Sequence, residues 1–141
     1  MKTTERLITQ LKIMEGLRLT AYRDAAGVLT IGYGHTQGVR EGDRISEYWA
    51  NELLAEDVAR VAVAVKELKV ARTEGQLDAL VSLAFNIGIE ALKRSTLLRV
   101  IRSGGSKADI KREFRRWVYC KGKVLPGLVK RREWEAKRFF E

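Results

Sequence analysis

The chain of 141 residues contains a single cysteine, and it has no long apolar run. Because Cys120 stands alone, no intrachain disulfide can form, which suits synthesis in a reducing cytoplasm. The longest unbroken apolar run extends only from Val61 to Val65, whereas a membrane-spanning helix needs about 20 apolar residues. Near the start, Glu5 and Lys12 interrupt any signal-peptide core. We therefore expect a soluble protein with no transmembrane segment, unable to cross a membrane alone.

The overall composition is that of a folded globular protein. Hydrophobic residues make up 45% of the chain and charged residues 32%, proportions that differ from those of disordered proteins. A chain of this length buries roughly two-thirds of its unfolded surface. We therefore expect one domain over residues 1–141 that folds without a metal ion, and we see no sign of a metal site or a cofactor.

Charge is distributed unevenly along the chain. Residues 1–92 contain 11 Lys or Arg and 13 Asp or Glu, whereas residues 93–141 contain 16 and 5. The second part therefore has a net charge of +11 within a total of +9. Such a basic region attracts polyanions, but charge alone does not distinguish nucleic acid from the anionic polymers of a bacterial wall.

The N-terminal third predicts a helix followed by a small β-sheet. Apolar residues at helical spacing precede Glu15, and Gly16 is suited to end that helix. Residues 17–34 contain a turn signal before a β-prone run, which predicts a hairpin. A third short strand or loop over residues 37–45 would complete the sheet.

The rest of the chain predicts helices. Ser46 is suited to cap a long helix that reaches about Lys69, and Thr73 with Gln76 forms a capping box before a helix that ends near Gly88. Further helices are predicted over residues 95–103, 106–119 and 126–140. The predicted class is α+β and mainly helical. A small hairpin lobe (residues 14–58) is joined by a long helix to a helical lobe (residues 1–13 and 59–141), with a cleft between them.

Three polar residues of the N-terminal third suit the hydrolysis of a glycosidic bond. Glu15, Asp24 and Thr30 lie at a helix end, in a turn and on the returning strand. At the carbonyl end of a helix, the dipole and burial favour the neutral form of Glu15, as a proton donor requires. Asp24 in a polar turn stays ionised, and Thr30 is suited to hold a water beside it. Without further context, a turn-forming Asp24 and a surface Glu15 are the better explanation of these residues.

The surrounding sequence resembles a known family. The active-site region of phage-type lysozymes, glycoside hydrolase family 24, is similar to EGLRLTAY (residues 15–22), Asp24 and GVLTIGYGHT (residues 27–36). Residues 76–88, 95–98, 114–117 and 125–132 resemble later segments of this family in the same order. The resemblance therefore spans nearly the whole chain and implies the lysozyme-like fold.

The resemblance implies both the reaction and the roles of these residues. Glu15 matches the family's catalytic acid, Asp24 its second carboxylate and Thr30 the threonine of its triad. The implied reaction is hydrolysis of the β-1,4 bond between N-acetylmuramic acid and N-acetylglucosamine in peptidoglycan, with inversion at the anomeric carbon. Inversion needs carboxyl groups roughly 6.5–9.5 Å apart, a distance that the sequence does not fix.

Other site residues are predicted with less support. Tyr33, Gly34 and Thr36 follow the active-site strand, and Phe85 resembles a cleft position of the family, so all four are candidates for substrate binding. Core packing explains Phe85 equally well, and Trp117 and Trp134 are expected in the core.

The only histidine, His35, is expected to form a structural ion pair. The resemblance points to Asp57 on the long helix as its partner, although a catalytic base is an alternative reading of this histidine. The basic run at residues 130–132 could contact peptidoglycan carboxylates or pair with Glu15, and a solvated helix face explains it almost as well.

Three alternatives are weighed at this stage. One is a catalytically inactive lysozyme-like protein, and the intact set of Glu15, Asp24 and Thr30 argues against it. A lytic transglycosylase cleaves the same bond without water, and the Asp24–Thr30 pair argues against it. A nucleic-acid-binding protein would explain the basic C-terminal part, but no familiar nucleic-acid motif is complete.

For the lysozyme, we expect a monomer that binds peptidoglycan glycan strands and no nucleic acid. It would be made in the host cytoplasm and act on the wall after release across the inner membrane. A holin-type permeabilising partner is implied for that release.

Overall fold

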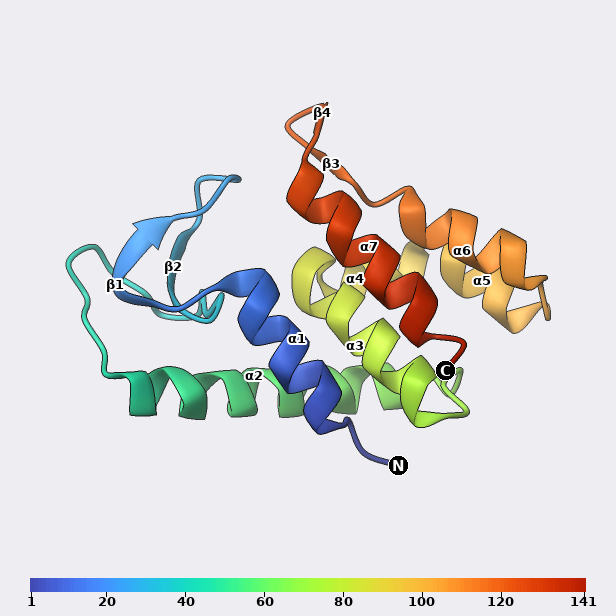
Figure 1. Ribbon diagram of the computed structural model, residues 1–141, viewed down its shortest axis with the longest axis horizontal. Helices are drawn as coiled ribbons and strands as arrows, with labels where there is room; N and C mark the ends of the chain where they lie inside the picture. The colour runs from blue at the N-terminus through green and yellow to red at the C-terminus, as the bar shows by residue number, and fades with distance from the viewer.

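The computed structural model describes all 141 residues and contains seven helices and two short hairpins. The N-terminal helix α1 (Glu5–Glu15) leads into the first hairpin, formed by β1 (Arg18–Arg23) and β2 (Leu29–Gly32). The long helix α2 (Glu47–Glu67) then runs beneath the hairpin and the remaining helices (Figure 1). This arrangement confirms the predicted α+β class. None of the helices is both long enough and apolar enough to cross a membrane.

The C-terminal half is built almost entirely from helices. They are α3 (Glu74–Ile87), α4 (Ile89–Arg94), α5 (Thr96–Arg102), α6 (Lys107–Arg115) and α7 (Pro126–Arg138). A second hairpin, β3 (Tyr119–Cys120) and β4 (Lys123–Val124), separates α6 from α7. In Figure 1 this hairpin stands at the top of the helical part, across from the β1–β2 turn.

Several predicted helix ends are confirmed in atomic detail. Gly16 follows α1 with φ +73°, a conformation that only glycine adopts easily. The Ser46 hydroxyl accepts a hydrogen bond from the Trp49 amide and caps α2. The Thr73 hydroxyl likewise accepts from the Gln76 amide at the start of α3. The alternating segment at residues 61–65 lies inside α2, as predicted.

Three details differ from the sequence-based predictions. The helix predicted over residues 106–119 ends at Arg115, because the β3–β4 hairpin begins at Tyr119. Helix α4 was not predicted. The Gln76 side chain accepts from the Arg72 amide, one residue before the expected capping-box partner. The segment at residues 37–45 contributes only a single bridge, Thr20 to Arg44, beside the first hairpin, and so behaves as the loop that was the other expectation.

The hydrophobic core lies among the helices. It contains 22 buried residues and includes Leu7 and Leu11 of α1 together with Phe114 and Phe139 from the C-terminal helices. The first helix therefore packs with the C-terminal half. That residues 1–141 form a single domain with the lobe limits given above stays a prediction.

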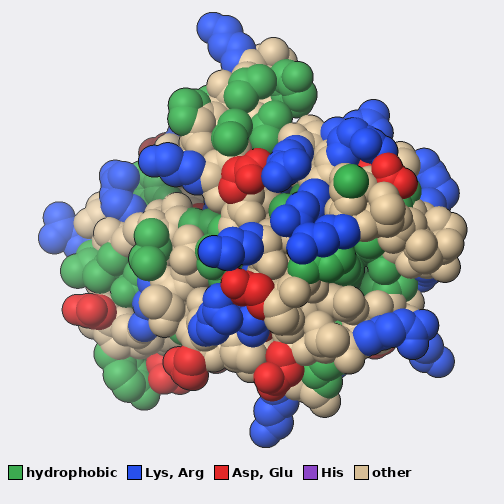
Figure 2. Space-filling model, turned by 45° about the vertical axis from the view of Figure 1, so that its right-hand side comes forward, with side chains coloured by type: hydrophobic (Ala, Val, Ile, Leu, Met, Phe, Trp, Pro, Cys, Tyr) green, Lys and Arg blue, Asp and Glu red, His purple; other side chains and the backbone are tan.

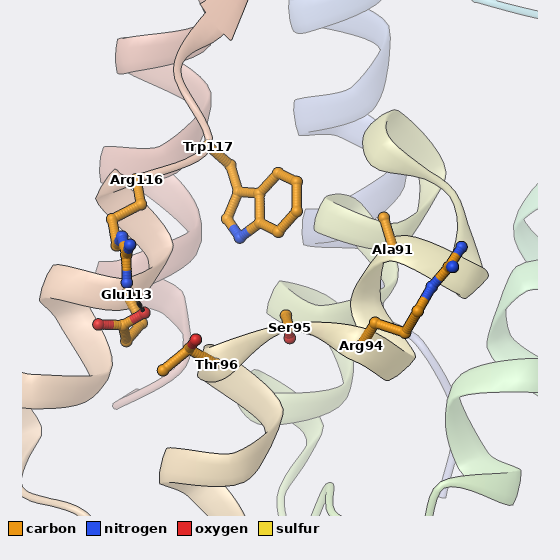
Figure 3. A pocket seen from close by; sticks show the side chains of 7 residues that line it. All are labelled: Ala91, Arg94, Ser95, Thr96, Glu113, Arg116 and Trp117. Atoms are coloured by element: carbon orange, nitrogen blue, oxygen red, sulfur yellow. Dashed lines mark hydrogen bonds and ion pairs between the residues drawn. The ribbon is translucent and has the colours of Figure 1, made fainter.

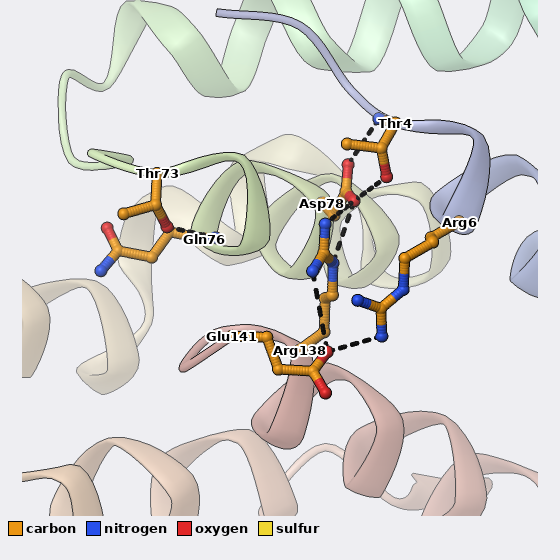
Figure 4. A network of polar contacts seen from close by, with 7 residues as sticks. All are labelled: Thr4, Arg6, Thr73, Gln76, Asp78, Arg138 and Glu141. Carbon is orange, nitrogen blue, oxygen red and sulfur yellow. Dashed lines mark hydrogen bonds and ion pairs between the residues drawn. The ribbon is translucent and has the colours of Figure 1, made fainter.

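The two ends of the chain are joined through a buried carboxylate. Asp78 of α3 is fully buried. It accepts hydrogen bonds from the Thr4 amide at 2.9 Å and from Arg138 Nε and Nη2 at 3.1 and 3.0 Å. Arg6 pairs with Glu141 at 2.7 Å in the same network (Figure 4). These contacts fix the start of α1 against α3 and α7, and thereby fix the position of Glu15 at the other end of α1.

Candidate active site

A pocket of about 420 Å³ brings together Glu15 and Asp24. Its volume falls within the range of roughly 300–1,000 Å³ that is typical of ligand sites. The first hairpin supplies one wall, and the end of α3, the β3–β4 hairpin and the start of α7 supply the other. The lining residues are Glu15, Asp24, Ala25, Ala26, Asn86, Ile87, Trp117, Tyr119, Cys120, Leu125 and Leu128. The predicted cleft between the hairpin and the helical part is therefore present.

Glu15 is held at the edge of this pocket by close packing on one side. It is the last residue of α1, and 16% of its side chain is exposed. Gly34 backs the carboxyl group so closely that a β-carbon at this position would lie 2.5 Å from Glu15 Oε1. Gly34 also has φ +75°, which side-chain-bearing residues rarely adopt. Residue 34 therefore has to be glycine for Glu15 to keep its position.

An arginine of the last helix pairs with Glu15. Arg131 Nη1 donates to Glu15 Oε2 across 116 residues of sequence. The Arg131 side chain is 8% exposed, and its Nε and Nη2 have no hydrogen-bond partner in the protein. Of the three sequence-based interpretations of the basic run at residues 130–132, the pairing with Glu15 is thus confirmed for Arg131.

Asp24 is anchored through one of its two carboxylate oxygens. In the turn between β1 and β2, Asp24 Oδ1 accepts hydrogen bonds from the amides of Ala26 and Val28, both at 2.9 Å. Oδ2 has no partner in the protein. The turn therefore holds Asp24 through Oδ1 and leaves Oδ2 available.

Thr30 lies behind the pocket surface. It sits on β2 opposite Tyr22, and only 2% of its surface is exposed. Its hydroxyl donates to the Val28 carbonyl at 2.8 Å. Because the hydrogen is used there, the oxygen lone pairs remain able to accept a bond. Thr30 is absent from the pocket lining, so two of the three predicted catalytic residues share the pocket wall and the third lies one layer deeper.

Tyr22 is a residue of this site that the sequence did not single out. Burial raises the pKa of its hydroxyl, and the negative charge of Glu15 raises the pKa further. The guanidinium of Arg18, 4.1 Å from the centre of the ring, acts in the opposite direction. Tyr22 therefore stays protonated at neutral pH and places a neutral phenol near the Glu15 carboxylate.

The residues predicted to bind substrate are divided between two places. Gly34, Thr36 and Phe85 line a smaller pocket of about 150 Å³, next to His35 and Asp57. Tyr33 belongs to the hydrophobic core with 7% of its surface exposed, and it lines neither pocket. The substrate-binding roles of these four residues stay predictions.

The expected contact between His35 and Asp57 is present. His35 Nδ1 lies 2.8 Å from Asp57 Oδ2, and its Nε2 lies 2.8 Å from the Gln37 carbonyl oxygen. Both ring nitrogens face acceptors, so only the doubly protonated ring satisfies both. Arg60 pairs with the second Asp57 oxygen. This cluster links the end of the first hairpin to α2, as a structural role requires.

A third pocket, of about 500 Å³, adjoins the cleft at Trp117. Figure 3 shows the indole ring above the junction of α4 and α5, at Ser95 and Thr96. The end of α6 forms the wall that faces the α4–α5 junction, and there Arg116 Nη1 donates to Glu113 Oε1 at 3.0 Å. Because Trp117 also lines the pocket of Glu15 and Asp24, its ring stands between the two. Trp117 packs against the core, as predicted, and it also lines both of these pockets.

The basic character of the C-terminal half is visible on the surface. Figure 2, in which the helical end of the molecule is turned forward, has many Lys and Arg side chains and fewer Asp and Glu side chains. Some of these cations are paired, such as Arg115 with Glu133 at 2.7 Å and Arg112 with Asp109. The excess of positive charge was predictable from composition alone.

Comparison with known proteins gives consistent matches. A family model described as phage lysozyme matches residues 12–135. The endolysin of Acyrthosiphon pisum secondary endosymbiont phage 1 is 41% identical over 143 residues, which cover 99% of this chain and 98% of that protein. The endolysin of Bacillus phage B103 is 45% identical over 94% of this chain, which spans about half (51%) of that longer relative. Among solved structures, the endolysin from Escherichia coli O157:H7 phage FAHEc1 superposes with a TM-score of 0.85 at 35% identity, covering 100% of this chain and 94% of that one.

Proposed function

Because this chain belongs to the phage lysozyme family, we propose that it hydrolyses the β-1,4 bonds between N-acetylmuramic acid and N-acetylglucosamine in bacterial peptidoglycan, with Glu15 as the acid. The observation that carries the proposal is the shared pocket of Glu15 and Asp24. One carboxyl group is packed against Gly34 and Arg131, and the other is anchored by two backbone amides. Two carboxyl groups in different settings suit an acid and a base.

In the first half of the reaction, Glu15 gives its proton to the oxygen of the departing sugar. In the free protein Glu15 is paired with Arg131, and only a protonated carboxyl group can act as the acid. A glycan strand that excludes water from the pocket makes the neutral form more favourable. The bond between the anomeric carbon and this oxygen then breaks, and positive charge develops on the sugar ring.

In the second half, a water attacks the anomeric carbon from the Asp24 side. The free Oδ2 of Asp24 takes one proton of the water, and the Thr30 oxygen accepts a hydrogen bond from the other. The new carbon–oxygen bond forms on the face opposite the departing sugar. Atoms balance: the water oxygen ends on the anomeric carbon, one proton ends on Asp24, and the proton of Glu15 ends on the departing sugar. This route inverts the anomeric configuration.

The biological setting follows from the relatives, which are phage endolysins. We infer that the wall of a bacterial host is the target, and that the basic C-terminal half speeds encounter with anionic wall polymers. Synthesis in the host cytoplasm, release across the inner membrane and a holin-type permeabilising partner stay predictions. So do the monomeric state and the absence of a cofactor.

The test is clearing of cells whose outer membrane has been removed. The wild-type protein is expected to lower the turbidity rapidly, whereas Glu15→Gln keeps the shape of the side chain but cannot donate a proton. Glu52→Gln is the matched control, because Glu52 is exposed on α2 and lines none of the pockets described above. Clearing by the Glu15→Gln variant at the rate of the control, with both proteins folded, would refute the role of Glu15.

A further inference from the structure

The second hairpin forms part of the cleft wall that faces the first hairpin. Tyr119 and Cys120 of β3 line the same pocket as Asp24, Ala25 and Ala26. In Figure 1 the β3–β4 hairpin stands at the top of the helical part, and the β1–β2 turn lies somewhat lower on the other side. A glycan strand that reaches Glu15 and Asp24 therefore has to pass beside this hairpin.

The hairpin is tightly constrained. Tyr119 pairs with Val124 and Cys120 with Lys123, and the Leu125 amide donates to the Val118 carbonyl at 3.0 Å. The turn consists of Lys121 and Gly122, with φ +51° and +78°. Two successive positive φ angles are typical of the two-residue turns that match strand twist. Tyr119 is thus held in position before any ligand binds.

Tyr119 combines this fixed position with an open ring. Although it lines the pocket, 65% of its surface is exposed. Apolar residues dominate the wall beside it, among them Leu125, Leu128 and Ile87. An exposed aromatic ring on a rigid support offers a large contact area at a small loss of conformational entropy. A pyranose ring presents a face of C–H groups and an edge of hydroxyl groups. The C–H face complements the apolar wall, and the hydroxyl groups complement the carboxylates at the end of that wall.

We propose that Tyr119 is a substrate-positioning residue, whose ring contacts the C–H face of a sugar in the glycan strand. The β3–β4 hairpin is then the helical-side wall of the binding groove. This inference rests on the proposed function, because it assigns a sugar to the same cleft. Tyr119 takes no part in proton transfer, so it acts on the binding of the strand and leaves the chemical step to Glu15 and Asp24.

Steady-state kinetics on purified peptidoglycan strands test the proposal. Tyr119→Ala is expected to raise KM about tenfold with little change in kcat, which is the usual effect of removing an aromatic anchor. Tyr119→Phe keeps the ring and is expected to recover most of that loss. Tyr48→Ala is the matched control, since Tyr48 is also 65% exposed and lines none of the pockets described above. If Tyr119→Ala and Tyr48→Ala have equal KM values at equal melting temperatures, the proposal is wrong.

The only cysteine supplies a second readout that does not depend on turnover. Cys120 is partly exposed on the same strand and lines the same pocket. In the Glu15→Gln variant, bound glycan strands should slow alkylation of Cys120 by a thiol reagent, and adding Tyr119→Ala should remove that protection at the same strand concentration. If bound strands do not slow the alkylation of Cys120 in the Glu15→Gln variant, the inference is wrong and the proposed function is unaffected. Failure of the wild-type protein to cleave strands at all would instead count against the proposed function.

Discussion

Replacing Gly34 with alanine tests how closely the fold positions the catalytic acid. The added β-carbon would lie 2.5 Å from Glu15 Oε1 and 2.7 Å from Glu15 Cδ, whereas ordinary contacts begin at 3.4 Å. The carboxyl group must therefore move by roughly 1 Å, a displacement that costs an enzyme about 100-fold in rate. The backbone at φ +75° adds about 1–2 kcal/mol of strain for any residue with a β-carbon.

Gly38→Ala separates these two effects. Gly38 has a similar φ of +71°, but a β-carbon there would meet nothing within 4 Å. Both variants should lose about 1–2 kcal/mol of unfolding free energy in urea titrations, and only Gly34→Ala should lose most of its kcat on peptidoglycan strands. Equal kcat values for the two alanine variants would show that Glu15 does not need the position that Gly34 imposes.

Four further predictions concern ionisable groups of the protein. Asp57→Asn removes the charged partner of the only histidine, so it should lower the unfolding free energy by about 2 kcal/mol and leave much of the clearing activity; lost activity at an unchanged melting temperature would contradict a structural role. Glu135 is fully buried, accepts from Arg132 Nη2 at 3.1 Å, and burial raises its pKa. Glu135→Ala should therefore cost about 3–5 kcal/mol in urea titrations, and replacing both partners with Leu and Met should cost less; an equal cost for the single and double variants would argue against a coupled pair. Because the charge of Glu15 helps to raise the pKa of Tyr22, that pKa should fall toward 10.0 in Glu15→Gln, as ultraviolet titration can measure. An unchanged Tyr22 titration in Glu15→Gln would contradict the proximity of Tyr22 and Glu15. The raised pKa of Tyr22 also means that the unfolding free energy should decline as the pH rises above 10.0, because the unfolded chain ionises this tyrosine first.

Local signals in the sequence were sufficient for much of the fold. Gly16 ends α1 directly after Glu15, and Ser46 and Thr73 cap the helices that follow them. These features depend on side-chain-to-backbone bonds within three or four residues, which residue types alone predict. The positions of Glu15 and Asp24 on one pocket then followed from a helix end and a turn that are close in sequence.

What the sequence did not provide depends on contacts between distant residues. Arg131 reaches Glu15 across 116 residues, and residue types allowed any member of the basic run to do so. The β3–β4 hairpin was missed because its turn is Lys121-Gly122, a weaker signal than Asn-Gly. Its flanking residues also continued a helical pattern from α6. Tyr119 and Trp117 could therefore be assigned to the cleft only after this hairpin was placed.

Cleavage of purified peptidoglycan in water enriched in oxygen-18 tests the central claim most directly. If a water held at Asp24 and Thr30 attacks the anomeric carbon, each new muramic acid reducing end carries one heavy oxygen, which mass spectrometry detects. Anhydro ends without the label, lighter by one water, would contradict hydrolysis and indicate the transglycosylase reaction instead.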